Sequence, residues 1–493
     1  MTITIQNLLN VAGVDTSMQF IGEIGCPVVS ADSRKMVPGG LFIALVGISS
    51  DGHDFIETAA KNGAAAALVE RVNENVSMPQ FVVASTRAVW GPVLAQFYDN
   101  PQLKMDFVGI TGTNGKTTTT YILEKILTDA GHLCGVIGTI EYRYGKTKIP
   151  SNFTSPDPEI LYPVLDEMAR GGTDTIIMEV SSHSLAQMRV GGLRFKAALL
   201  TNFTQDHLDF HKTMNEYASA KGLLFRNHLT ENAFVCAWDE SDYLDTIIPE
   251  NSDAVLFGST KSAHAVISDT SSTISGVRAT VTWKNEQVTF ESMLIGDHNI
   301  LNITGALLIA SSFDVEMSKA ASSVNDVVVP GRLARIPGKV PVFVDYAHTP
   351  DALDRSQKAL RHLVVGRLIT VFGCGGDRDA GKRPKMGASV LNGSDIGVVT
   401  SDNPRTEDPL KIIDMILEGM KNEIRFPPEN TMPHSGFTVI PDRAEAIKWA
   451  VGRACYDDCI LIAGKGHEDY QIIGKTKIHF DDSEHAASAL KDK

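Results

Sequence analysis

Residues Thr111 to Thr120, T-G-T-N-G-K-T-T-T-T, lie between an apolar run, Met105 to Ile110, and a helical pattern that ends before Gly131. A strand, a glycine-rich turn and Lys-Thr at the start of a helix surround a polyphosphate with backbone N–H groups. The usual phosphate-loop motif has a glycine where this chain has Ile110. A plain turn that caps a helix is the alternative, but it leaves the Gly-Lys-Thr order to chance. We therefore predict an ATP site.

Each residue type in this loop suits a polyphosphate. Gly112 and Gly115 let the backbone approach an anion, Lys116 supplies a positive charge, and the Thr117 hydroxyl can coordinate Mg²⁺. The predicted ATP-binding residues of the loop are Gly112, Thr113, Asn114, Gly115, Lys116, Thr117 and Thr118.

The composition is that of a globular protein with several hydrophobic cores. The chain has 493 residues, of which 43% are hydrophobic and 21% charged, and this length suits about three domains. The net charge of −14 argues against nucleic acid as a partner, because a nucleic-acid surface requires a basic face.

The cysteines and the apolar runs indicate a cytoplasmic protein. The six cysteines are scattered without metal-ligand spacing, apart from one weak C-x3-C pair, which favours free thiols in a reducing compartment. No N-terminal leader is evident, and no apolar run approaches the roughly 20 residues of a membrane span. We expect a cytoplasmic monomer without a membrane span.

Breaks in the pattern predict three domains of the α/β class. Residues 1–102 alternate short strands and helices as a small N-terminal α/β domain. Residues 103–335 hold the phosphate loop on a parallel sheet, with an antiparallel extension from about 230 to 292. Residues 336–493 show regular strand–helix alternation and predict a Rossmann-like domain.

Polar loops follow the predicted strands of the central domain. Glu179 lies near the end of one strand, and the next strand opens onto Thr201 to His211. Ligands of open α/β sheets bind beyond the carboxyl ends of the strands, so Glu179 and His207 are candidate Mg²⁺ ligands beside Thr117. Mg²⁺ prefers oxygen ligands, and a histidine that is merely hydrogen-bonded in its loop is the alternative.

Four polar loops follow the strands of the C-terminal domain, starting at Asp345, Gly373, Ser401 and Gly464. Arg378 and Arg405 suit carboxylates, while Asp402 and Glu468 can hold an ammonium group. Together these side chains predict a pocket for a zwitterion such as an amino acid. Each loop alone is also compatible with a solvated, charged turn.

Nine motifs give the whole chain a resemblance to the Mur ligases of bacterial cell-wall synthesis, in particular to those members that add the third residue of the peptide stem. The motifs are D-S-R-K-M-V-P-G-G-L-F from Asp32, D-G-H-D-F-I from Asp51, T-G-T-N-G-K-T-T from Thr111, E-V-S-S-H-S-L from Glu179, T-N-F-T-Q-D-H-L-D-F-H from Thr201, A-K-G-L-L-F from Ala220, P-G-R from Pro330, D-Y-A-H-T-P-D from Asp345 and G-K-G-H-E from Gly464. Their order and spacing are specific to that family.

The resemblance implies ATP-dependent joining of an amino acid to UDP-N-acetylmuramoyl-L-alanyl-D-glutamate. The D-glutamate γ-carboxylate would attack the ATP γ-phosphate, and the amine would then displace phosphate from the acyl phosphate. The protein contributes mainly positioning and charge neutralisation. The cofactors implied are ATP and Mg²⁺, and the phosphate loop and the Asp345 loop, from different domains, would share one ATP after domain closure.

The resemblance also implies roles for individual residues. Asn299, Arg332, Asp345 and His348 would bind ATP, and Thr117, Glu179 and His207 would hold Mg²⁺. Ser33, Asn152, Thr154, Ser155, Ser181, Gln187 and Arg189 would bind the UDP-linked substrate; many relatives have Thr-Thr at Thr154-Ser155. The residues implied in catalysis are Lys116, Glu179, His207 and Lys221.

Lys221 has two interpretations. Its residue type favours a solvated surface position, whereas the resemblance implies that it is carbamylated to N6-carboxylysine, which requires a neutral amine. Apolar neighbours on a predicted helix, Tyr217 to Phe225, are consistent with the second interpretation.

The amino acid is predicted from the Asp402-Asn403-Pro404-Arg405 segment. Within the family, an arginine here resembles the version that selects meso-2,6-diaminopimelate, whose distal carboxylate needs a cationic partner. The predicted pocket consists of Arg378, Asp402, Asn403, Arg405, Gly464 and Glu468.

Three other functions compete with this prediction. A ligase for L-lysine would differ only in the acceptor pocket. A folylpolyglutamate synthetase would share the ATP site but would not need the Asp32 and Asp51 segments. A phosphate-loop ATPase or a non-catalytic nucleotide-binding module would handle ATP without a nucleotide-sugar.

Overall fold

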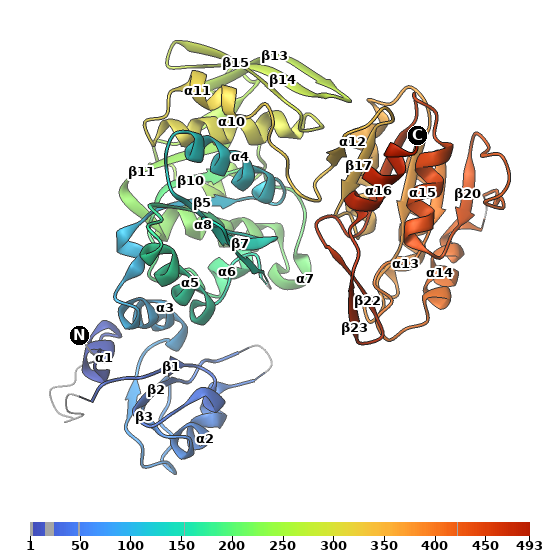
Figure 1. Ribbon diagram of the computed structural model, residues 1–493. Coiled ribbons are helices and arrows are strands. Elements are labelled where there is room, and N and C mark those ends of the chain that lie inside the picture. The colour runs from blue at the N-terminus through green and yellow to red at the C-terminus, as the bar shows by residue number, and fades with distance from the viewer. Residues whose placement is uncertain (1–2, 15–23, 48–49, 152, 422) are drawn as a thin grey trace. The chain divides into compact units, whose positions relative to one another are not determined.

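A computed structural model describes residues 3–14, 24–47, 50–151, 153–421 and 423–493. The chain forms two compact units, Met1–Val266 with Gly305–Ala320, and Ile267–Thr304 with Ala321–Lys493. We refer to them as unit 1 and unit 2. Both units combine parallel sheets with helices (Figure 1), which confirms the predicted α/β class.

The secondary structure consists of short strands and helices along the whole chain. The strands are β1 Val29–Ser30, β2 Gly40–Ile43, β3 Ala64–Val69, β4 Gln80–Val82, β5 Asp106–Thr111, β6 Cys134–Ile137, β7 Glu141–Tyr144, β8 Thr147–Pro150, β9 Thr175–Glu179, β10 Phe195–Leu200, β11 Leu229–Trp238, β12 Val255–Gly258, β13 Ala265–Thr273, β14 Gly276–Trp283, β15 Glu286–Ser292, β16 Ala334–Ile336, β17 Val342–Asp345, β18 Leu368–Phe372, β19 Ile396–Val399, β20 Gly436–Val439, β21 Cys459–Ala463, β22 Tyr470–Ile473 and β23 Thr476–His479. The helices are α1 Ile5–Val11, α2 Ile56–Lys61, α3 Thr86–Phe97, α4 Lys116–Asp129, α5 Pro158–Arg170, α6 Ser182–Ala186, α7 Leu208–His211, α8 Met214–Asn227, α9 Leu244–Ile247, α10 His298–Ser311, α11 Met317–Ser323, α12 Pro350–Arg361, α13 Lys382–Gly393, α14 Pro409–Leu417, α15 Arg443–Arg453 and α16 Asp482–Lys491.

The main sheet of unit 1 places β5, which leads into the phosphate loop, between β10 and β9. Strands β12, β11, β10, β5, β9 and β6 pair in this order and are parallel, and β7 and β8 continue the sheet antiparallel. The carboxyl ends of β5, β9 and β10 therefore lie at one edge of the sheet.

The expected antiparallel extension is only partly correct. Strands β14 and β15 form an antiparallel hairpin, but β11 and β12 pair in parallel. The segment between β11 and β12 contains the short helix α9, and the local pattern of apolar residues does not specify that it returns the chain to a parallel strand.

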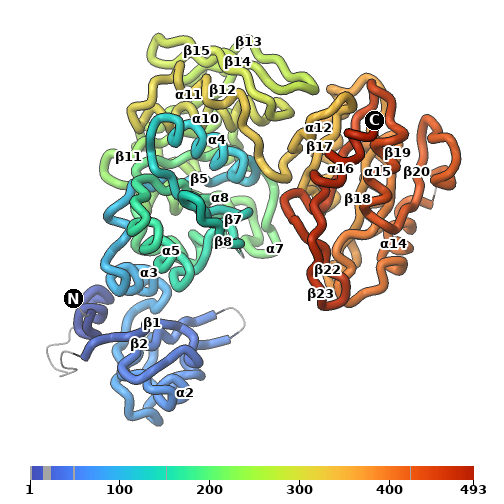
Figure 2. Tube along the Cα trace, viewed as in Figure 1, coloured from blue at the N-terminus to red at the C-terminus, as the bar shows by residue number. Residues whose placement is uncertain are grey.

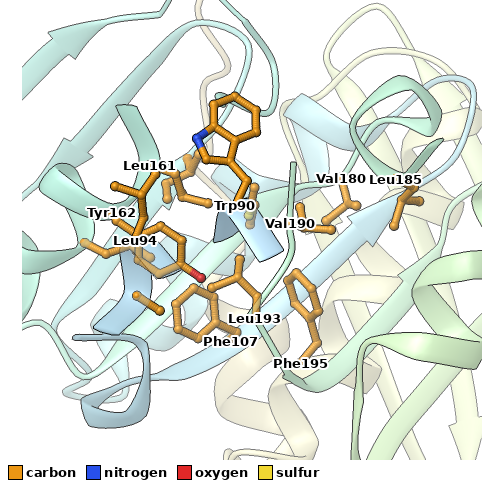
Figure 3. Close-up of a cluster of buried hydrophobic side chains, with 14 of the residues drawn as sticks. Trp90, Leu94, Phe107, Leu161, Tyr162, Val180, Leu185, Val190, Leu193 and Phe195 are labelled. Atoms are coloured by element: carbon orange, nitrogen blue, oxygen red, sulfur yellow. The ribbon is translucent and has the colours of Figure 1, made fainter. Parts of the chain in front are cut away.

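The small N-terminal sheet shares a core with the central sheet. Strands β1 to β4 are parallel, and helix α3 carries Trp90 and Leu94 into a buried cluster with Leu161 and Tyr162 of α5 (Figure 3). The Tyr162 hydroxyl donates to the carbonyl oxygen of Gly191 at 2.7 Å. Apolar burial on this scale is the main contribution to holding these elements together.

Helices cover both faces of the sheet of unit 2, because successive side chains of each strand point to opposite faces and are buried on both. Its order is β16-β17-β21-β18-β19-β20, with all neighbours parallel except β16 and β17. Leu368 and Phe372 of β18 pack with the helices α12, α13 and α14, whereas Ile369 and Val371 pack with α15 and α16. Figure 2 traces the path of the chain through these strands and helices. The polar loops at the strand ends therefore follow strands β17, β18, β19 and β21, which are buried throughout.

Two expectations concern the whole chain. All six cysteines lie within the described residues and are free thiols, as predicted. Among those residues, no helix has both the length and the apolar character needed to cross a membrane.

Candidate active site

The phosphate loop opens onto a helix whose first turn has no side-chain cap. Gly115 is the residue before α4 and has φ 84°, and Gly112 has φ 148°. The ammonium of Lys116 donates to the carbonyl oxygens of Gly112 and Thr113 at 2.8 and 2.9 Å. The N–H groups of an uncapped helix start favour an anion, so the loop has the geometry of a phosphate site.

The loop after β10 fixes the phosphate loop from the side. Thr113 Oγ1 donates to the carbonyl oxygen of Thr204 at 3.0 Å, and the Asn114 N–H donates to Asn202 Oδ1 at 3.0 Å. A Cβ atom at Gly112 would lie 1.9 Å from Thr201 Oγ1. Gly112 is therefore required by this neighbouring loop as well as by the approach of an anion.

Thr117 and Glu179 meet in the interior of unit 1. Thr117 Oγ1 donates to Glu179 Oε2 at 3.1 Å, and Thr139 donates to the same carboxylate through its N–H at 2.9 Å and its hydroxyl at 2.8 Å. Glu179 is 1% exposed, and its recorded partners are all neutral donors. A buried carboxylate without a cation is costly, so this oxygen-rich pair fits Mg²⁺.

His207 lies beside aromatic neighbours and the carboxylate of Asp206. Its ring centroid is 4.8 Å from that of His183 and 5.9 Å from that of Tyr217, and Nε2 is 3.7 Å from Asp206. Burial and the charge of Lys116 lower the pKa of His207, while Asp206 opposes this shift. A neutral imidazole is the form that binds metals. The described part of the chain contains no cluster of three His, Cys, Asp or Glu side chains suited to a metal.

Lys221 is fully buried against the phosphate loop. It is 1% exposed, its ammonium donates to the carbonyl oxygen of Gly112 at 2.8 Å, and it lies 4.5 Å from the ring centroid of Tyr217. Burial, with a contribution from Lys116, lowers the pKa of Lys221 well below its ordinary value. The expectation from residue type, a solvated surface lysine, is wrong.

Five residues predicted to bind the UDP-linked substrate form one hydrogen-bonded network. Ser155 Oγ accepts from the Ser181 N–H at 3.1 Å and donates to the Glu179 carbonyl oxygen at 2.8 Å. Arg189 donates to Gln187 Oε1 at 2.8 Å and to the carbonyl oxygen of Ser155 at 3.3 Å.

Thr154 completes this network. Its hydroxyl lies 3.0 Å from that of Thr139, which in turn contacts Glu179. The predicted Asn152 lies outside the described residues. The network therefore connects the predicted substrate loop with the Thr117–Glu179 pair.

Ser33 lies in a loop that helix α5 anchors. Ser33 is buried in a short turn whose first residue, Asp32, accepts from the Arg34 N–H. Just before it, the Ser30 hydroxyl and the Ala31 N–H donate to the carboxylate of Glu159 at 2.8 and 2.5 Å. Glu159 was not predicted from the sequence, because one glutamate at a helix start carries no functional signal.

Two of the four predicted ATP residues of unit 2, Asp345 and Arg332, lie at the loop after β17. Asp345 accepts from the N–H groups of Leu333 and Ala347 at 2.8 and 2.9 Å and from the Ser356 hydroxyl at 3.0 Å. Burial raises the pKa of Asp345, although Arg332 opposes the shift. Arg332 stands 5.6 Å from the ring centroid of Tyr346.

The remaining two residues of this set make different contacts. His348 Nδ1 lies 2.8 Å from the carbonyl oxygen of Tyr346, and burial lowers the pKa of this imidazole. Asn299 is buried near the start of α10, where it donates to the carbonyl oxygen of Ile295 at 2.8 Å and accepts from Asn302 at 2.9 Å.

The loops after β19 and β21 meet at Asp402, Asn403 and Glu468. Asn403 Nδ2 donates to Glu468 Oε2 at 2.9 Å. A Cβ atom at Gly464 would lie 2.7 Å from Asp402 Oδ2, and Gly464 has φ 119°. Burial and the charge of Asp402 raise the pKa of Glu468. Two carboxylates in such proximity suit an ammonium group.

The predicted arginines lie on the loops after β18 and β19. Arg405 Nη1 donates to the carbonyl oxygen of Gly376 at 2.8 Å, and Arg378 Nη1 donates to that of Asp377 at 3.3 Å. Arg405 has φ 51°, a conformation rarely adopted by a side chain of this size. The strand-end loops of unit 2 thus converge as predicted, with cationic and anionic groups in one region.

Comparisons with known families match three parts of the chain. The Mur ligase family catalytic domain matches residues 27–98, the Mur ligase middle domain matches residues 110–310, and the Mur ligase glutamate ligase domain matches residues 331–466. These matches agree with the order of motifs along the chain.

Two curated relatives are similar over almost the whole length. UDP-N-acetylmuramoyl-L-alanyl-D-glutamate--2,6-diaminopimelate ligase of Gloeobacter violaceus is 40% identical over 493 residues, which cover 99% of this chain and 98% of the relative. The protein of the same name from Geobacter sulfurreducens is 39% identical over 475 residues, 93% of each chain.

Solved structures show the same architecture. A structure titled UDP-N-acetylmuramoyl-L-alanyl-D-glutamate--2,6-diaminopimelate ligase has a TM-score of 0.73 and 30% identity, covering 100% of this chain and 99% of that chain. MurF ligase of Thermotoga maritima in complex with ADP has a TM-score of 0.56 and 19% identity over 94% of this chain and 97% of its own. The second likeness shows the fold alone.

Proposed function

The chain belongs to the Mur ligase family, and we propose that it joins 2,6-diaminopimelate to the D-glutamate of UDP-N-acetylmuramoyl-L-alanyl-D-glutamate at the expense of ATP. The observation that carries this proposal is the buried set of Thr117, Glu179 and Lys221 around the phosphate loop. It occurs in a chain about 40% identical over its full length to a ligase of that name.

The reaction requires activation of a carboxylate. An oxygen of the D-glutamate γ-carboxylate attacks the ATP γ-phosphorus, the bond to the ADP oxygen breaks, and an acyl phosphate and ADP form. The amine of the amino acid then attacks the acyl carbon, loses a proton, and expels phosphate as the amide forms. Proximity and charge neutralisation account for most of the acceleration in reactions of this type.

ATP binding is assigned to two sets of residues in this proposal. In unit 1 the phosphate loop, Gly112 to Thr118, contacts the phosphates through its N–H groups and through the ammonium of Lys116. In unit 2 the proposed ATP-binding residues are Asn299, Arg332, Asp345 and His348. The uncapped start of α4 supports the first assignment.

Mg²⁺ is held by Thr117, Glu179 and His207 in this proposal. The buried Thr117–Glu179 pair fits the ion because the carboxylate has only neutral donors among its recorded partners. When bound, the ion neutralises the charge of the phosphate oxygens.

Lys221 is carbamylated in the working enzyme. Carbamylation joins a neutral amine to CO₂ with loss of a proton, and it converts a buried cation into an anion. Burial lowers the pKa of Lys221 and so favours the neutral amine that the reaction needs. The carbamate of Lys221 would lie beside the phosphate loop, close to the carbonyl oxygen of Gly112.

The UDP-linked substrate contacts both sheets of unit 1. Ser33 binds near the uridine end, while Asn152, Thr154, Ser155, Ser181, Gln187 and Arg189 bind the peptide and muramoyl part. The hydrogen bonds that link Ser155, Ser181 and Arg189 support a shared role for these residues.

The amino acid is the meso isomer of diaminopimelate. Arg405 and Arg378 pair with its carboxylates, and Asp402, Asn403 and Glu468 bind its distal ammonium group, with Gly464 leaving room for the Asp402 carboxylate. A pocket that holds arginines for a carboxylate rejects L-lysine, because binding L-lysine leaves a guanidinium unpaired.

The proposal includes a location and an assembly state. Its substrates, ATP and a UDP-linked sugar, place the enzyme in the cytoplasm, where it acts as a monomer. A sedimentation measurement that gives a mass of twice the 53.3 kDa chain would contradict the second point.

The test is release of ADP by the purified protein. We expect release only when both UDP-N-acetylmuramoyl-L-alanyl-D-glutamate and an amino acid are present, and faster release with meso-diaminopimelate than with L-lysine. Release that is independent of both substrates would identify a phosphate-loop ATPase instead, and faster use of L-lysine would identify the lysine-adding type.

A further inference from the structure

Lys465 is a buried lysine directly behind the proposed acceptor pocket. It lies between Gly464 and Gly466 in the loop after β21, and it is 0% exposed. Its ammonium donates to Asn403 Oδ1 at 3.1 Å and lies 3.8 Å from Glu468 Oε2. A charged lysine is almost never fully buried unless it has partners, and the rings of Tyr470 and Phe480 complete its surroundings at 5.7 and 5.9 Å.

The contact with Lys465 fixes the orientation of the Asn403 amide. Asn403 Oδ1 accepts from Lys465 and also from the Ile472 N–H at 2.9 Å. Two donors on the oxygen leave only the NH₂ group to face Glu468, to which it donates at 2.9 Å. The position of the Glu468 carboxylate therefore depends on an amide that Lys465 and one backbone group hold in place.

The buried charges around Lys465 are not balanced. Arg443 and Asp482 are both fully buried and form two hydrogen bonds of 2.7 Å, and Arg443 Nη1 also lies 4.0 Å from Asp402 Oδ2. Lys465 is the second buried cation, beside the carboxylates of Asp402 and Glu468. These two cations and the carboxylates of Asp402, Glu468 and Asp482 leave one negative charge, which suits a single ammonium group from a ligand.

Burial acts on both members of the Lys465–Glu468 pair. It lowers the pKa of Lys465, and the charge of Asp402 opposes this shift. It raises the pKa of Glu468, and the charge of Lys465 opposes that shift. Each charge therefore favours the ionised form of the other. Without the ammonium, two neighbouring carboxylates would face each other and one would tend to bind a proton.

We propose that Lys465 is a positioning residue for the amino-acid substrate: it holds Asn403 and Glu468 in the arrangement that binds the distal ammonium group, without touching the substrate. This inference rests on the proposed function and adds a residue behind the pocket that determines how tightly the amino acid binds. Its effect acts through Glu468, so loss of Lys465 weakens binding of the amino acid and leaves the binding of ATP and of the UDP-linked substrate unchanged.

The chain provides a matched control. Lys477 of β23 lies 3.7 Å from the ring centroid of Tyr470, and Lys465 lies 5.7 Å from the same ring centroid. Lys477 is exposed, whereas Lys465 is buried. Lys477→Met and Lys465→Met thus remove the same group near one aromatic residue, and only the second removes a contact with Asn403.

The experiment measures steady-state constants for all three substrates with the full-length protein. For Lys465→Met we expect KM for meso-diaminopimelate to rise about tenfold or more, equivalent to about 1.4 kcal/mol. We expect kcat and the KM values for ATP and the UDP-linked substrate to stay within about threefold, and Lys477→Met to match the wild type.

Two further variants separate the explanations. In a Glu468→Gln background, Lys465→Met should add little to KM, because the lysine acts through that carboxylate. If Lys465→Met does not fold, Lys465→Gln keeps a donor but removes the charge and should still raise KM for meso-diaminopimelate. An unchanged KM in a folded Lys465 variant, or an equal rise for ATP, would overturn the inference. A wild-type protein that ignores the amino acid would instead contradict the proposed function.

Discussion

The ammonium of Lys221 lies 2.8 Å from the carbonyl oxygen of Gly112, and so connects helix α8 to the phosphate loop through a fully buried contact. A single hydrogen bond to a backbone carbonyl does not offset the cost of burying an ammonium group. The position is therefore one that stability alone does not explain, which is typical of a functional residue.

Replacement of Lys221 separates its contribution to activity from its contribution to stability. We expect Lys221→Met to lower kcat by about 100-fold or more, because a charged group beside the phosphate loop is lost. The melting temperature should stay the same or rise, because an apolar side chain replaces a buried polar group that is costly to bury. Thermal denaturation and ADP release measure the two effects, and a wild-type kcat would contradict the assigned role.

Carbamylation of Lys221 makes the activity depend on CO₂. Enzyme kept in buffers free of bicarbonate should lose activity and regain it when bicarbonate is added, whereas Lys221→Met should not respond. Activity that is identical with and without bicarbonate, after long incubation in both, would exclude a carbamate at this position.

Arg405 is predicted to select the amino acid. Its φ of 51° would strain most replacements, so Arg405→Asn is the suitable variant, since asparagine tolerates this conformation. We expect KM for meso-diaminopimelate to rise about tenfold or more. The preference over L-lysine should fall by a similar factor. Competition between the two amino acids measures this preference, and an unchanged ratio would place the selective contact elsewhere.

Glu159 is predicted to position the loop that binds the UDP end of the substrate. Glu159→Gln weakens the contacts with Ser30, Ala31 and Lys35, so KM for the UDP-linked substrate should rise about threefold to tenfold. KM for ATP should not change. The control is Glu57→Gln, which changes an exposed glutamate that pairs with Lys61 in the N-terminal domain that also contains Ser30. An equal effect of both variants would contradict the prediction.

His211 is predicted to make stability depend on pH. It is 5% exposed, contacts Ser182 Oγ at 2.9 Å, and burial, the largest cause, lowers its pKa from 6.5 to about 4. The unfolded chain therefore binds a proton at higher pH than the folded protein does. The contribution of His211 to stability is complete above pH 6.5 and is lost as pH falls toward about 4.

Unfolding by urea at several pH values tests this dependence. The free energy of unfolding should fall more steeply between pH 6.5 and 4 in the wild type than in His211→Gln. Parallel curves for the two proteins would show that the imidazole of His211 does not titrate differently in the folded state.

Much of the fold could be predicted because its strands are short, buried and separated by helical patterns. Strands β18, Leu368–Phe372, and β21, Cys459–Ala463, are continuous buried runs of the kind that the alternation in residues 336–493 predicts. Their polar ends converge because parallel strands place their carboxyl ends at one edge. The parallel β11–β12 pairing could not be predicted, since the residue pattern of the segment between the two strands does not specify a crossover.

Residues of the candidate site could be predicted where their residue type and their motif indicate the same role. They could not be predicted where only their burial and contacts reveal the role. Lys465 and Glu159 are common surface residue types, and only their contacts with Asn403 and with Ser30 distinguish them. The Thr139 contacts with Glu179 likewise join residues 40 positions apart. In the sequence, only its position between two glycines distinguishes Lys465, because glycines let the backbone approach neighbouring loops closely.

Isotope transfer tests the central claim, that the enzyme activates the γ-carboxylate as an acyl phosphate. UDP-N-acetylmuramoyl-L-alanyl-D-glutamate labelled with ¹⁸O in that carboxylate is converted with ATP and meso-diaminopimelate, and the released phosphate is analysed by mass spectrometry. The account predicts that each phosphate carries one oxygen from the carboxylate, because the bond between the acyl carbon and that oxygen breaks. Unlabelled phosphate, with the amide product formed, would contradict the account.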